Sequence, residues 1–422
     1  MNNPYKKTTL PNGIRLITTP MKNTKAVTVL VLVACGSRYE TQEINGISHF
    51  VEHMVFKGTK KYPKSLDVAK TLDALGAQYN AMTDKETTGF YAHVPAKHLD
   101  IALDVLSDFL VNPLFPKAEV EKERGVILEE IKMRNDMPMV LATVLLEKVL
   151  FGNVPLGWDI AGEMETVGGI THQKILDFVD KYYSNKSLVV SVAGDLGQAD
   201  QKKIEEYFSS RTSGKPESFK PVATKRKPKA LILNKKTEQS HLRLGIYGYN
   251  IYHKDYYVFE ALGEILGGSM SSRLFEEVRE KRGLAYYIQS GITSFRDAGY
   301  LGIYAGIAHE KVIETTEIIM NELKRIAEDI VSEEELVRNK ERLKGQMILG
   351  FEDSFEVADF YGGQEVLDEK TKTLEEVLHE VEIIERKDIL RVARDILKEE
   401  NMNLALVGPE KDKNIFFKLM RI

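Results

Sequence analysis

Three segments in the first half of this 422-residue chain resemble three segments in the second half, in the same order. Partner segments are 213 to 218 residues apart, and the pairs are 90–110 with 303–323, 119–131 with 336–348, and 187–196 with 402–410. Chance similarity of strand–helix patterns is the simpler alternative, but three matches at nearly one offset favour a duplicated unit of about 210 residues. We therefore expect two homologous domains, each with its own core.

Each copy has the same order of patterns, which is strands, then long helices, then a closing strand. In the first copy, β-branched or alternating runs at 13–20, 26–34 and 87–95 indicate strands, and 98–111 and 117–136 have helical periodicity. This order predicts an α+β fold in which helices pack on a mainly antiparallel sheet.

A stretch rich in Pro, Ser and Lys lies between the two copies and has no periodicity. Such a composition is typical of a linker. The sequence thus predicts a first domain at 1–212, a linker at 213–227 and a homologous second domain at 228–422.

Charge and cysteine content restrict the partners and the compartment. A net charge of -5 gives no reason to expect a nucleic-acid partner. The longest apolar run, 26–35, is about half as long as a membrane span, so we expect no membrane insertion. The first twenty residues lack the apolar segment of a secretory signal, and the single cysteine, Cys35, cannot form an intrachain disulfide. We expect a cytoplasmic protein.

Residues 49–53 form the pattern H-x-x-E-H, which the second copy lacks. His49 and His53 are four residues apart, so a helix places both rings on one face. Neutral imidazole suits Zn²⁺, and catalytic zinc commonly has three protein ligands and a water. Glu52 lies beside the same face, where it can act as a general base without binding the metal. A pair of core histidines is the alternative, but this pattern is the inverted form of a known zinc helix.

A third ligand must come from elsewhere, and residues 117–136 offer Glu121, Glu123, Glu129 and Glu130. Glu123 and Glu130 share one helical stripe with an apolar residue between them, whereas Glu129 is rotated by about 100°. If this stripe faces the metal, Glu130 is the ligand and Glu123 orients a histidine. Glu129 then lies on a solvated face.

These residues resemble the insulinase/pitrilysin-type zinc peptidases, a family that includes mitochondrial processing peptidase, along essentially the whole chain. "HFVEHMVFKGT", from His49 to Thr59, is close to the zinc helix of that family, and "ERGVILEEI" resembles the helix that carries its third ligand. The resemblance implies one Zn²⁺ per chain, held by His49, His53 and Glu130. It also implies that Glu52 is the base and Glu123 a supporting carboxylate.

Two further stretches share this resemblance. "YNAMTDKETTGFY" is similar to the edge strand on which the family binds its substrate, so peptide backbone is expected to pair with Tyr79, Asn80, Ala81, Met82 and Thr83. "GGSMSSRLFEEVREKRGLAYYIQS" is similar to a C-terminal stretch of the family whose arginine and tyrosine map onto Arg279 and Tyr286. The resemblance implies that both reach the substrate and the oxygen that becomes anionic.

The expected function is a zinc-dependent endopeptidase that cleaves extended peptides or unfolded segments inside a closing chamber. The resemblance implies a homodimer, or a heterodimer, that encloses the substrate. One alternative is a non-catalytic subunit of a heteromeric processing complex, and another is a zinc hydrolase acting on a non-peptide amide. Non-catalytic members of the family usually lose part of the metal motif or of the Arg/Tyr pair, whereas this chain has both, so the enzyme is favoured.

Overall fold

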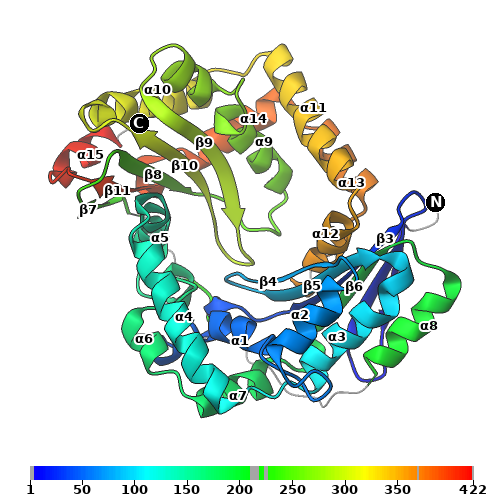
Figure 1. The fold of residues 1–422 in the computed structure, drawn as a ribbon. Helices are drawn as coiled ribbons and strands as arrows, with labels where there is room; N and C mark the ends of the chain where they lie inside the picture. The colour runs from blue at the N-terminus through cyan, green and yellow to red at the C-terminus, as the bar shows by residue number, and fades with distance from the viewer. Residues whose placement is uncertain (1–3, 210–217, 223–226, 368–369, 421–422) are drawn as a thin grey trace. The chain divides into compact units, whose positions relative to one another are not determined.

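The structure, a computed structural model, describes residues 4–209, 218–222, 227–367 and 370–420 (Figure 1). These residues form two sheets of mostly antiparallel strands with helices packed on them, which confirms the predicted α+β fold. Of the predicted linker, residues 213–217 and 223–226 lie outside the described residues.

Packing divides the chain into two compact units that are not continuous in sequence. The first contains 1–131, 159–220 and 347–373, and the second contains 132–158, 221–346 and 374–422. These units differ from the predicted boundaries 1–212 and 228–422 because each takes in a helical segment from the opposite half of the chain.

The first unit is built on a six-stranded sheet in the order β1-β2-β6-β3-β5-β4. Its strands are β1 (Lys6–Thr9), β2 (Arg15–Pro20), β3 (Ala26–Val33), β4 (Gln78–Thr83), β5 (Thr88–Pro95) and β6 (Leu188–Gly194). β2 and β6 are parallel, and the other neighbouring pairs are antiparallel. Its helices are α1 (Ile47–Val55), α2 (Ser65–Asp73), α3 (Leu99–Val111), most of α4 (Lys117–Asn135), α6 (Met164–Gly168), α7 (His172–Tyr182), α8 (Gln198–Tyr207) and α12 (Ser354–Val366).

Both faces of this sheet are buried, as the side-chain alternation of β3 shows. Val27, Val29 and Val31 belong to the large core that the sheet shares with α1, α3 and α4. Leu30 and Leu32 point to the opposite face and pack with residues of α12, which lies against β3 and β6 (Figure 1). The sheet is therefore the middle layer of three.

The second unit is built on a five-stranded sheet in the order β7-β11-β8-β10-β9. Its strands are β7 (Lys229–Asn234), β8 (Ser240–Tyr247), β9 (Ala285–Ser294), β10 (Gly299–Ile307) and β11 (Met402–Gly408). Its helices are α5 (Pro138–Phe151), α9 (Tyr256–Gly267), the π-helical turn Phe275–Glu280, α10 (Val312–Glu328), most of α11 (Glu333–Gly350), α13 (Leu374–Glu382), α14 (Arg386–Ile396) and α15 (Lys413–Leu419). α5 packs on β8 and β11, the place that α12 takes in the first unit.

The two sheets repeat one topology. β2, β6, β3, β5 and β4 of the first sheet correspond in order to β7, β11, β8, β10 and β9 of the second. The parallel pair recurs as β7 with β11, and the remaining pairs are antiparallel in both. This correspondence agrees with the duplication predicted from the sequence. No helix in the described part of the chain is both long and apolar enough to cross a membrane.

Candidate metal centre

α1 carries the two histidines on a helix whose other sides are buried. Its fully buried residues are Ile47, Ser48, Phe50, Val51, Met54 and Val55. The side chains of His49 and His53 retain 12% and 22% of their exposure, so they stand at the edge of the core. The packed sides of the helix fix its rotation, and this rotation aims both imidazoles at one point.

A buried carboxylate fixes the start of α1. Glu40, 4% exposed, accepts hydrogen bonds from the backbone N–H groups of Gly46 at 2.8 Å and Ser48 at 2.9 Å, and from Nδ2 of Asn45 at 2.9 Å. An acceptor at this position satisfies donors that the helix leaves open. Gly46 has φ +96°, and a Cβ there would lie 2.7 Å from the Ala161 carbonyl oxygen, so only glycine fits.

α4 supplies the acidic side of the centre. Its buried residues Val120, Glu123, Ile127 and Ile131 follow helical spacing and turn this stripe inward. The Glu130 side chain lies at the border of the stripe and is 30% exposed, whereas Glu129 is exposed on another side of the helix.

Three side chains of the first unit bring one ligand atom each to a common point. The Nε2 atoms of His49 and His53 are 3.3 Å apart, and Oε2 of Glu130 lies 3.6 Å from the first and 3.7 Å from the second. Ligand atoms around a tetrahedral zinc ion lie about 3.3–3.6 Å from one another, because each is about 2.0–2.2 Å from the metal. The donor set and its spacing therefore fit Zn²⁺ with one position left open.

Glu123 orients one of these ligands. Its Oε2 lies 3.1 Å from Nδ1 of His53, so Nδ1 carries the proton and donates it to the carboxylate. In the neutral ring this leaves the lone pair on Nε2, the atom that faces His49 and Glu130.

Glu52 stands between the two histidines in sequence and next to β4 in space. Burial raises the pKa of its carboxyl above the ordinary value, while the neighbouring Thr83 side chain acts in the opposite direction, as would His53 if it were protonated. The negative charge of Glu130 raises the pKa again. A carboxyl group with a raised pKa is a stronger base than an ordinary carboxylate, which suits a group that accepts and returns a proton.

The five residues predicted to bind substrate lie in β4, an edge strand of the first sheet that packs beside α1. The rings of Tyr79 and Phe56 are 6.5 Å apart, which places the strand next to the end of the histidine helix. The N–H of Ala81 donates to Oδ1 of its neighbour Asn80 at 2.9 Å instead of pairing with β5. The outer side of β4 thus offers backbone groups to a further strand.

Arg279 and Tyr286 belong to the second unit. Arg279 is exposed near the end of the π-helical turn, with its guanidinium carbon 4.9 Å from the centre of the Phe275 ring. Tyr286 is the second residue of β9 and is 73% exposed. Both side chains are therefore accessible in their own unit.

Two residues with close links to this centre were not predicted. Lys57 pairs with Glu123. It lies four residues after His53, as His53 lies four after His49, so this spacing could have predicted that Lys57 is close to the centre. Glu40 lies in a loop with no periodicity, and the sequence carries no signal for its cap.

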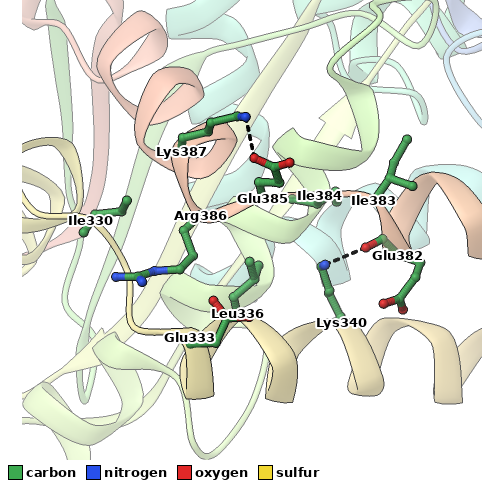
Figure 2. A pocket seen from close by; sticks show the side chains of 10 residues that line it. All are labelled: Ile330, Glu333, Leu336, Lys340, Glu382, Ile383, Ile384, Glu385, Arg386 and Lys387. Carbon is green, nitrogen blue, oxygen red and sulfur yellow. Dashed lines mark hydrogen bonds and ion pairs between the residues drawn. The ribbon is translucent and has the colours of Figure 1, made fainter.

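The second unit contains a separate open depression, between α11 and the segment that joins α13 to α14 (Figure 2). Its volume is about 660 Å³, and its lining mixes three acidic with three basic side chains. The basic side chains are already engaged: Lys340 donates to the Glu382 carbonyl, Arg386 to the Val331 carbonyl, and Lys387 pairs with Glu385.

Comparison with known families finds two matching profiles. The profile described as insulinase (peptidase family M16) matches residues 15–163, and the one described as peptidase M16 inactive domain matches residues 169–343. The candidate metal ligands all lie in the first match, and the second begins in the first copy and extends over part of the copy that lacks H-x-x-E-H.

Curated relatives match over nearly their whole length. A Bacillus subtilis protein named uncharacterized zinc protease YmxG is 37% identical over 406 residues, which cover 96% of this chain and 98% of the relative. A Rickettsia felis protein named uncharacterized zinc protease is 34% identical, covering 95% of this chain and 96% of the relative.

Solved structures share the fold. A protease from Helicobacter pylori superimposes with a TM-score of 0.91 at 23% identity, covering 96% of this chain and 99% of that chain. A Pseudomonas fluorescens structure titled peptidase M16 inactive domain gives a TM-score of 0.88 at 20% identity, covering 96% and 98%.

Proposed function

Because the chain belongs to the insulinase family of peptidases, family M16, we propose that it is a zinc-dependent endopeptidase. The observation that carries this proposal is the convergence of His49, His53 and Glu130 beside Glu52. The zinc-protease names of the curated relatives support the choice of metal.

In this proposal His49, His53 and Glu130 hold one Zn²⁺ per chain, and Glu123 keeps the lone pair of His53 directed at it. The ion would lower the pKa of a bound water and polarise the carbonyl of the scissile peptide bond. Two neutral imidazoles and one carboxylate leave a net positive charge at the centre, which suits both effects.

Glu52 moves the protons. Its carboxylate takes a proton from the attacking water and then donates it to the amine that leaves. Partial burial limits the access of competing water to the carboxylate.

The substrate binds in an extended conformation along β4. Its backbone pairs with the outer side of Tyr79, Ala81 and Thr83, and a substrate carbonyl replaces the Asn80 side chain on the N–H of Ala81. Backbone pairing makes few demands on substrate sequence, so unfolded segments and peptides are the expected substrate class.

We further propose that Arg279 and Tyr286 contribute donors to the oxyanion and to the substrate, and that two chains pair to enclose the peptide. These parts of the proposal rest on family resemblance. Sedimentation of the purified protein tests the pairing, and a monomer at assay concentration that cleaves peptides would contradict it.

The decisive experiment is to incubate the purified protein with a mixture of unfolded peptides, with zinc or with a chelator, and to map cleavages by mass spectrometry. Internal cleavages that disappear with the chelator and return with zinc are expected. Peptide binding without cleavage in the presence of zinc would favour a non-catalytic subunit.

A further inference from the structure

Lys57 lies just beyond the end of α1 and forms an ion pair with the carboxylate that supports His53. We propose that Lys57 is a positioning residue of the metal centre: it holds Glu123 in the orientation that keeps the Nε2 lone pair of His53 on the metal. This inference rests on the proposed zinc site.

The contacts of Glu123 show why it needs a second partner. Glu123 is 7% exposed, and its two oxygens go to different groups: Oε2 to Nδ1 of His53 at 3.1 Å and Oε1 to Nζ of Lys57 at 2.6 Å. A buried carboxylate is stable only when it is paired and hydrogen-bonded. The neutral His53 ring provides a hydrogen bond, and Lys57 provides the positive charge.

The neighbouring cations on α4 are engaged with other groups. Lys122 pairs with Glu119, while Arg124 pairs with Glu121 and donates to the Val167 carbonyl. Lys57 is the cation paired with Glu123 among the described residues.

The backbone around Lys57 is also fixed. Its N–H donates to the Met54 carbonyl at 3.1 Å, and the next residue, Gly58, has φ +141° and packs against Pro63, where a Cβ would lie 2.5 Å from a carbonyl oxygen. The backbone that carries the Lys57 side chain is therefore held in a defined position.

The ion pair between Lys57 and Glu123 has a consequence for metal binding. Without Lys57, Oε1 loses its partner and the carboxylate can rotate, either away from His53 or toward the metal as a competing ligand. Loss of an outer partner of a metal ligand typically lowers metal affinity by about 10–100-fold.

The test is a double-mutant cycle read by zinc affinity, measured by competition with a chromophoric chelator. Lys57→Met is expected to raise the Kd for zinc about tenfold, and Lys57→Arg to restore affinity because a guanidinium also pairs with carboxylate. In a Glu123→Gln background, Lys57→Met should change the Kd by less than about twofold, since coupled residues do not act additively. Lys60→Met, an exposed lysine three residues further on, is the matched control and should bind zinc like wild type.

Unchanged zinc affinity in Lys57→Met would overturn the inference, as would an equal loss in the Glu123→Gln background. If Lys57→Met does not fold, Lys57→Gln replaces it in the same cycle. Wild-type protein that binds no zinc would instead overturn the proposed function. Zinc binding without peptidase activity would contradict that function alone, because affinity is measured without turnover.

Discussion

Glu129 and Glu130 are neighbours in the sequence, yet only Glu130 reaches the histidines. The buried stripe of α4 decides this, since Ile127 and Ile131 turn Glu130 toward α1 and leave Glu129 exposed. The pair therefore compares the proposed ligand with a neighbouring glutamate that does not reach the histidines.

Zinc content is the first prediction at this scale. His49→Ala, His53→Ala and Glu130→Gln should each lower zinc affinity by at least about 100-fold, because each removes one of the three proposed ligands. Plasma emission spectroscopy after dialysis measures the bound zinc. Glu129→Gln is the control and should keep zinc. Zinc loss in Glu129→Gln with full zinc in Glu130→Gln would show that Glu129, and not Glu130, is the ligand.

A second prediction separates proton transfer from metal binding. Glu52→Gln keeps the shape of the side chain but cannot accept a proton, so kcat should fall by about 10²–10⁴ while zinc content stays unchanged. Loss of zinc in this variant would make Glu52 a ligand, and a wild-type rate would remove it from the reaction.

At the scale of single elements, α1 is held at both ends by buried carboxylates, Glu40 at the start and Glu123 beyond the end. Burial raises the pKa of Glu40 to about 7, and hydrogen bonds from Ser48, Gly46 and Asn45 only partly oppose this. The native state therefore binds a proton more tightly than the unfolded chain does.

The third prediction follows from the sign of that shift. A carboxyl whose folded pKa is raised contributes stability below its unfolded pKa of about 4.5, and this contribution is lost as the pH rises through 7. The unfolding free energy of wild type minus that of Glu40→Gln should thus fall by about 2 kcal/mol between pH 5 and pH 8.5. Urea denaturation of both proteins in chelator at several pH values measures this difference. If the unfolding free energies of the two proteins change with pH in parallel, the assigned pKa of Glu40 is contradicted.

Element order and the direction of side chains on helices were predictable because both follow from residue spacing. The i, i+4 rule placed His49 with His53, and the stripe containing Ile127 distinguished Glu130 from Glu129. Lys57 fits the same spacing but was not singled out, since a lysine after a helix is usually a solvated charge. Glu40 was unpredictable because its role depends on a fold-specific approach of a loop to α1.

At the scale of the whole molecule, the exchange of α5 and α12 between units could not be predicted. An apolar helix stripe shows that a helix is buried but does not state which of two similar sheets it covers. Leu146 and Leu150 of α5 pack with Tyr247 of the second sheet, while Val357 of α12 packs with Leu30 of the first.

The fourth prediction asks whether the second copy takes part in the reaction. Tyr286→Phe removes one exposed hydroxyl, so folding and zinc content should not change. If the phenol donates to the oxyanion, kcat should fall by about 10², as for loss of one such donor. Steady-state kinetics on a single peptide measures kcat. Full activity of Tyr286→Phe would show that the Tyr286 hydroxyl takes no part in the reaction.

The position of α12 in the first unit also has a consequence for biosynthesis. The strands that carry Leu30 and Val189 leave the ribosome early, but their covering helix, Ser354–Val366, is translated more than 150 residues after β6 ends. At about 5–20 residues per second, one face of the first sheet stays uncovered for on the order of 10 s during synthesis. We therefore expect the nascent chain to expose an apolar face that a ribosome-associated chaperone could bind until Ser354–Val366 has been made.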